Sequence, residues 1–91
     1  MRVEVGSANW QNLETLLDTT FTEGKNYDVQ VVKGQLNQQV MVVEGASEPT
    51  DPEDGFVITF NQGLTITKES GINVYVKSFN AGAVINVAEG E

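Results

Sequence analysis

The sequence predicts a small all-β domain: an antiparallel β-sandwich, or a jelly-roll or barrel-like arrangement, of about seven or eight strands. Short runs of alternating apolar and polar residues recur along the chain. Turn-forming residues separate these runs at intervals of roughly 8–12 residues, which is typical of small β folds. The length of 91 residues fits one domain over residues 1–91.

The N-terminal segment mixes strand and helix signals. Residues 2–5 alternate in polarity, which predicts a first strand. Over residues 9–18 the apolar side chains fall at helical spacing, with Ser7 or Asn9 as a candidate N-cap. The threonine-rich segment 19–21 that follows favours a strand instead. A short helical turn and an irregular strand therefore both stay open for residues 9–18.

The other strands follow from alternation. Apolar residues alternate with polar ones over residues 27–31, 56–60, 64–67 and 72–77, and residues 38–44 and 83–88 are further strand-like runs rich in apolar residues. Residues 45–55 contain both prolines and four acidic residues, which indicates a surface loop. Asn80-Ala81-Gly82 is typical of a hairpin turn.

Several of these strands carry apolar residues on both faces. A sandwich strand needs one apolar face, because its other face is solvated. A second apolar face therefore indicates a second buried surface, and we expect an interface between copies of the chain. The residues expected there are Met41, Val43, Val57, Tyr75 and Val84. The alternative is that their strand propensity alone explains them.

Composition excludes most catalytic chemistry. The chain has no cysteine and no histidine, which removes the Ser-His-Asp and Cys-His constellations and the usual zinc and haem ligands. We therefore expect no enzyme, no cofactor and no metal. Five basic and 13 acidic residues give a net charge of −8, which argues against nucleic acid and membranes as partners.

Two features are candidate ligand sites. Trp10 is the single tryptophan: exposed, it would stack on a sugar, and buried, it would anchor the N-terminal segment in the core. The acidic loop offers oxygen ligands for calcium, although its spacing does not match an EF-hand. A solvated acidic loop is the simpler interpretation, and a loop that does bind would meet a basic patch on a partner. Its acidic residues are Glu48, Asp51, Glu53 and Asp54.

Five motifs follow one another between about residue 10 and residue 89. They are Trp10, Gly24-Lys25-Asn26-Tyr27-Asp28-Val29-Gln30, Ala46-Ser47-Glu48-Pro49-Thr50, Tyr75-Val76-Lys77-Ser78 and Gly82-Ala83-Val84-Ile85-Asn86-Val87-Ala88-Glu89. In this order they resemble a group of small proteins encoded among the structural genes of tailed bacteriophages and prophages. The chain departs mildly from that pattern, with Tyr75 where tryptophan is common and Lys77 where arginine is usual.

The resemblance implies a non-catalytic virion protein: a capsid decoration, a head-fibre component or a tail accessory part. It also implies assembly in the cytoplasm of the bacterial host, contacts with other virion proteins and a homo-oligomer, commonly a trimer. Symmetry multiplies weak contacts in such assemblies. The alternative from another class is a carbohydrate-binding β-sandwich module that uses Trp10.

Overall fold

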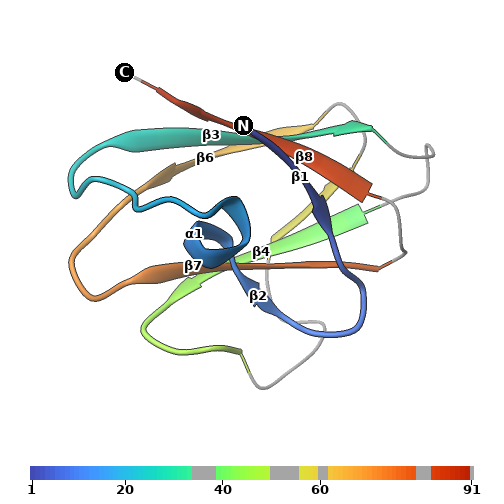
Figure 1. Ribbon diagram of the computed structural model, residues 1–91, viewed down its shortest axis with the longest axis horizontal. Coiled ribbons are helices and arrows are strands. Elements are labelled where there is room, and N and C mark those ends of the chain that lie inside the picture. Colours follow the sequence, from blue (N-terminus) through green and yellow to red (C-terminus); the bar gives the residue numbers. More distant parts are fainter. Residues whose placement is uncertain (34–38, 50–55, 60–61, 80–82, 91) are drawn as a thin grey trace.

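Two four-stranded sheets pack face to face in the computed structural model, which describes residues 1–33, 39–49, 56–59, 62–79 and 83–90. Sheet I contains, in spatial order, β1 (Arg2–Val5), β8 (Ala83–Glu89), β3 (Asn26–Lys33) and β6 (Gly63–Thr67). Sheet II contains β2 (Gln11–Asn12), β7 (Asn73–Ser78), β4 (Gln39–Gly45) and β5 (Phe56–Thr59). Every pair of neighbours is antiparallel, and Figure 1 shows the two layers. The predicted β-sandwich is confirmed.

Most consecutive strands lie in different sheets. Within the described residues, only β4 and β5 are neighbours both along the chain and in a sheet. The orders β1-β8-β3-β6 and β2-β7-β4-β5 are those of an eight-stranded jelly roll. A hairpin at residues 80–82 is therefore the wrong prediction, because β7 and β8 belong to opposite sheets. Residues 80–82 themselves lie outside the described residues.

The core lies between the two sheets and is built by alternation. Every second residue of a strand points to the same face, so each strand supplies one apolar row. Sheet I contributes its row from β3 and β8, and sheet II contributes from β4 and β7. The residues are Tyr27, Val29, Val31, Ala83, Ile85, Val87, Val40, Val42, Val74 and Val76, each at most 5% exposed.

The segment predicted as either helix or strand contains both. β2 is followed at once by α1 (Leu13–Leu17), so the helix begins beside sheet II. The side-chain oxygen of Asn12 accepts hydrogen bonds from the N–H groups of Glu14 (3.0 Å) and Thr15 (3.3 Å). Asn12 is therefore the N-cap, and the prediction of Ser7 or Asn9 is wrong. With five residues, α1 is far too short to span a membrane, and the described residues contain no helix that could.

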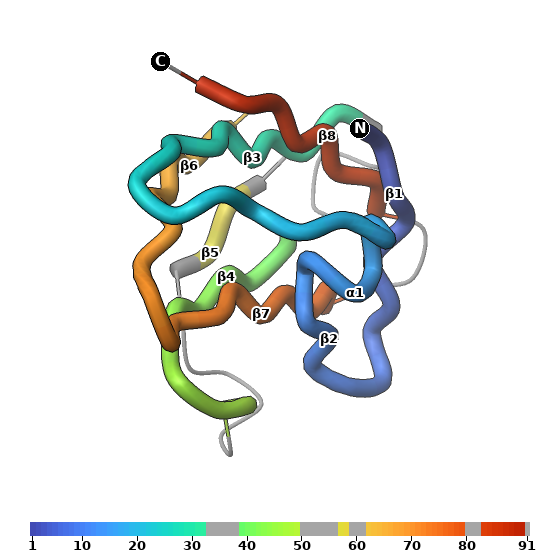
Figure 2. Tube along the Cα trace, turned by 60° about the vertical axis from the view of Figure 1, so that its left-hand side comes forward, coloured from blue at the N-terminus to red at the C-terminus, as the bar shows by residue number. Residues whose placement is uncertain are grey.

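Beyond α1, residues 18–25 run between the two layers before β3 begins (Figure 2). Asp18 ends the helix in the left-handed conformation, with φ of 54°. Phe21 is 4% exposed and stacks on the ring of Tyr27, with the ring centres 4.1 Å apart. Together with Leu13, which is fully buried, these contacts hold α1 and the following segment against the core.

Candidate functional site

The register of sheet II places four of the five expected interface residues on one face. Val40 and Val42 of β4 point into the core, so Met41 and Val43, which alternate with them, point outward. Residues that pair across an antiparallel ladder share a face. Met41 pairs with Val57 and Val43 pairs with Tyr75, so these side chains also lie on the outer face of sheet II.

Val84 does not join them. It pairs with Glu4 of β1 in sheet I, and it alternates with the core residues Ala83 and Ile85. Its half-buried side chain therefore lies on the outer face of the other sheet. The structure therefore places Val84 on a different face from the other four residues expected at the interface.

The outer face of sheet II is unevenly accessible. Val57 is 44% exposed, and Val43 and Tyr75 are half-buried. Met41, by contrast, has no exposed surface. In the single chain, the Met41 side chain therefore contributes no accessible surface to the expected interface. The accessible apolar surface of this face therefore belongs to the neighbouring side chains of Val43, Val57 and Tyr75.

Phe79 belongs to the same face and was not expected there. Its N–H donates a hydrogen bond to the carbonyl oxygen of Gln39 at 3.0 Å, which continues the pairing of β7 with β4 by one residue. Ser78 before it is fully buried, so the alternation directs Phe79 outward. Its side chain is 41% exposed. Its position two residues after Lys77 is the sequence signal that could have revealed it.

Lys77 lies within this apolar surface. It pairs with Met41, and its side chain is half-buried. Among the described residues, the ion pairs within 4.0 Å are Lys25–Glu89 and Lys68–Glu14, so Lys77 has no acidic partner there. An ammonium group that is further buried by a partner requires an acidic group or water. The surface therefore combines apolar area with one cation.

The outer face of sheet I has the opposite character. Asp28, Gln30 and Thr65 are exposed there, and Asn26 and Thr67 lie beside them. The hydroxyl of Thr65 donates to Asp28 at 2.8 Å, and that of Thr67 donates to Asn26 at 2.6 Å. These short polar side chains satisfy one another or face water. The two outer faces of the sandwich therefore differ: within the described residues, that of sheet II exposes Val57 and Phe79, whereas the apolar residue Val84 on that of sheet I is half-buried.

Trp10 is buried. Its side chain is 8% exposed, immediately before β2. Stacking on a sugar requires an open ring face, so the alternative site at Trp10 is contradicted by this burial. The interpretation of Trp10 as an anchor for the N-terminal segment agrees with the burial.

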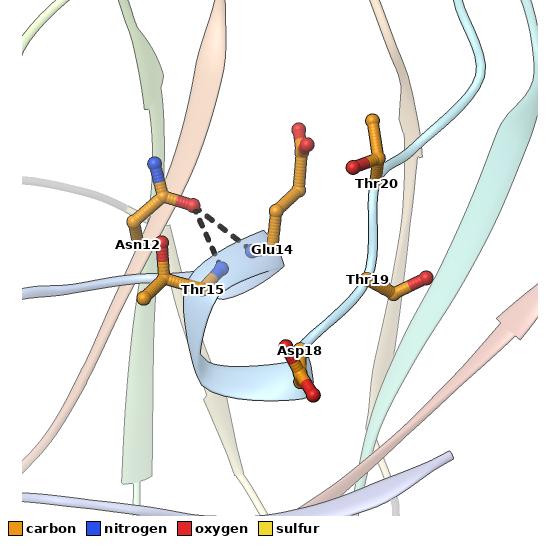
Figure 3. Close-up of a pocket in the computed structure, with 6 residues that line it drawn as sticks. All are labelled: Asn12, Glu14, Thr15, Asp18, Thr19 and Thr20. Carbon is orange, nitrogen blue, oxygen red and sulfur yellow. Dashed lines mark hydrogen bonds between the residues drawn. The ribbon is translucent and has the colours of Figure 1, made fainter.

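A shallow polar cavity of about 410 Å³ lies beside α1 (Figure 3). It is lined by Asn12, Glu14, Thr15, Asp18, Thr19 and Thr20. Asn12 already caps the helix. The carboxylate of Glu14 accepts hydrogen bonds from Lys68 Nζ at 2.7 Å and from the N–H of Phe21 at 3.3 Å. The side-chain oxygen of Asn12 and the carboxylate of Glu14, which both line the cavity, therefore already form hydrogen bonds within the chain.

The acidic loop is described only in part. Glu48 is exposed, while Asp51, Glu53 and Asp54 lie outside the described residues. In the described part of the chain, no three acidic side chains gather in a way that could hold a metal ion. Elsewhere on the surface, the hydrogen bond from Lys25 to Glu89 raises the pKa of Lys25, with their Nζ–Oε1 distance at 3.0 Å.

Comparisons with protein families, with curated proteins and with solved structures find no match to this chain.

Proposed function

We propose that this chain is a non-catalytic structural protein of a phage or prophage virion. It acts by binding copies of itself and other virion proteins through the outer face of sheet II. The observation that carries the proposal is the contrast between the two faces of the sandwich. Sheet II exposes Val57 and Phe79 beside half-buried Val43 and Tyr75, whereas sheet I exposes hydrogen-bonded polar side chains.

Contiguous exposed apolar surface on a small soluble domain marks a site of interaction. On the outer face of sheet II, Val57 and Phe79 are exposed and Val43 and Tyr75 are half-buried, which supports such a site, and the cation of Lys77 on the same face adds a preference for acidic groups. A copy of this chain supplies such groups, because 13 acidic residues outnumber five basic ones.

The assignment to a virion rests on the resemblance in sequence. The jelly-roll order is compatible with it, since this architecture occurs in viral capsid and lectin domains. A fold by itself does not determine a function. The position of the gene tests this part: a place among capsid or tail genes supports a virion protein, and a metabolic operon contradicts it.

The burial of Trp10 removes the support for the carbohydrate-binding alternative. It required an exposed Trp10, and that side chain is 8% exposed. Within the described residues, the large hydrophobic side chains that are exposed are Met1, Val57 and Phe79, and none of them is a tryptophan or tyrosine.

Size-exclusion chromatography with light scattering tests self-association. We expect a mass that rises with concentration above the 9.9 kDa of one chain. Phe79→Asp places a carboxylate on the outer face of sheet II and should shift the protein toward the monomer. The matched control is Gln30→Asp, which adds the same charge at an exposed position of sheet I. A wild-type protein that stays monomeric up to millimolar concentration, or equal behaviour of the two variants, would contradict the proposal.

A further inference from the structure

We propose that residues 13–25 form a strap that opens as one unit while both sheets stay folded, with the Glu14–Lys68 ion pair as its latch. The strap consists of α1 and of residues 18–25, which run between the two layers and lead into β3 (Figure 2). None of its residues belongs to a strand, so the ladders of the two sheets do not include it. Opening of the strap requires no second copy of the chain.

Few side chains hold the strap in place. A helix shorter than about 12 residues is marginal in water by itself, so the five residues of α1 depend on contacts with the rest of the chain. Leu13 and Phe21 are buried, and Leu16 and Leu17 pack half-buried against the core. Residues 22–25 are exposed. A segment with few fully buried side chains opens more readily than the core strands of the same protein.

The carboxylate of Glu14 joins three parts of the molecule. Its Oε1 lies 2.7 Å from Lys68 Nζ, and its Oε2 accepts a hydrogen bond from the N–H of Phe21 at 3.3 Å. Lys68 Nζ also donates to the carbonyl oxygen of Ile72 at 2.7 Å. One carboxylate therefore connects α1, the segment that follows it and the turn between β6 and β7. Because each contact holds the groups that make the next one, we expect these contacts to break together.

Opening of the strap uncovers apolar surface between the sheets. Phe21 stacks on the ring of Tyr27, with the ring centres 4.1 Å apart, and both residues belong to the core cluster that includes Leu13. The hydroxyl of Tyr27 accepts a hydrogen bond from the N–H of Thr22 at 2.7 Å. In the closed form Tyr27 is 5% exposed. When Leu13 and Phe21 move away with the strap, the Tyr27 ring and the core beside it become accessible, so the strap acts as a lid over an apolar opening.

Amide hydrogen exchange of the wild type at low urea concentrations tests the strap, because the sandwich stays folded there. The reporters are the amides of Thr19, Phe21 and Thr22, whose hydrogen bonds lie within the strap or at its contact with Tyr27. We expect them to share one opening free energy with a weak dependence on urea, since a local opening exposes little surface. The amide of Val29, in the middle of β3, should open at least about tenfold less often and with the steeper urea dependence of global unfolding. Equal free energies and slopes for the strap and Val29 would overturn the proposal.

Lys68→Met removes the latch. We expect the strap amides to exchange about a hundredfold faster in this variant, because the mostly buried carboxylate of Glu14 loses its partner. Lys25→Met is the matched control, since it removes the exposed ion pair with Glu89 and should change the exchange of the strap amides by no more than about threefold. Unchanged exchange of the strap amides in Lys68→Met would contradict the role of the latch.

Ile58→Val separates opening of the strap from global unfolding. Ile58 is buried on β5, at the opposite edge of sheet II from β2, which leads into the strap. The lost methyl group lowers the stability of the whole sandwich, so exchange at Val29 should become about two- to tenfold faster while the strap amides keep their rates. Equal acceleration of both would mean that the strap opens only when the protein unfolds, and the proposal would be wrong. The wild type and Ile58→Val decide the outcome even if Lys68→Met does not fold.

Discussion

Replacing Lys68 by methionine removes the charge from an ion pair that joins α1 to the turn between β6 and β7. Lys68 Nζ lies 2.7 Å from Glu14 Oε1, and the two side chains are 11% and 16% exposed. The same ammonium group donates to the carbonyl oxygen of Ile72 at 2.7 Å. Methionine keeps the unbranched apolar part of the side chain but removes its ammonium group. The Glu14 carboxylate then stays mostly buried, with the N–H of Phe21 as its hydrogen-bond donor in the structure.

The expected loss of stability follows from the burial of the Lys68–Glu14 ion pair. Removing one partner of a buried ion pair costs about 3–5 kcal/mol, because the other charge stays buried without compensation. Both side chains keep some contact with water, so the lower end, about 3 kcal/mol, applies here. A 91-residue domain is stable by about 5–14 kcal/mol in total. Such a loss lowers Tm by about 12–24 °C in a domain of this size.

Urea unfolding followed by Trp10 fluorescence measures this effect, since Trp10 is the single tryptophan and is buried. The control is Lys25→Met, which removes the other ion pair at a site where both side chains are more than half exposed. We expect no resolvable change in the control and a clear fall of the midpoint in Lys68→Met at the same protein concentration. Adding Glu14→Leu to Lys68→Met should recover part of the loss, because the unpaired carboxylate is then gone. Equal midpoints for Lys68→Met and Lys25→Met would refute the reasoning.

Three further outcomes follow from individual side chains. Leu13→Ala should cost about 2–5 kcal/mol in urea unfolding, because it opens a cavity at a fully buried position; a loss below about 1 kcal/mol would mean that α1 does not pack as described. Asn12→Ala should cost about 1 kcal/mol through the lost N-cap, whereas Asn9→Ala, at an exposed position outside the helix, should change nothing measurable. Acrylamide should quench Trp10 only weakly in the folded protein, and quenching as strong as that of free tryptophan would contradict its burial.

Runs of apolar and β-branched residues located most of the strands, although β2 was not among them. The runs around Val29, Val42, Val74 and Ile85 each form a strand with one apolar row in the core. The partners of these strands were not predictable in the same way. Turn chemistry at residues 80–82 indicates a reversal but does not say whether the chain returns to the same sheet. In a jelly roll it crosses to the other one, so the hairpin prediction failed.

The residues expected at the interface also show that local sequence pattern does not reveal which sheet a strand joins. Met41, Val43 and Tyr75 share the outer face of sheet II, because ladder pairing preserves the alternation within one sheet. Val84 has the same local pattern but lies in the other sheet, and only the topology reveals this. The burial of Met41 depends on what the rest of the chain places over it, which no periodicity contains. The N-cap was misplaced for a related reason, because β2 delays the start of the helix to Leu13.

The pairing of β1 with β8 has a consequence for how the protein is made. β8 lies between β1 and β3, and Val87 donates its N–H to the carbonyl oxygen of Met1 at 2.7 Å. β1 is therefore synthesised well before β8, and it gains its partner only after the strands between them have been made. Folding dominated by such distant pairings is slow, and unpaired strands are prone to aggregate in the meantime. Synthesis rate and chaperone supply should therefore limit the yield of folded protein more than the stability of the finished sandwich does.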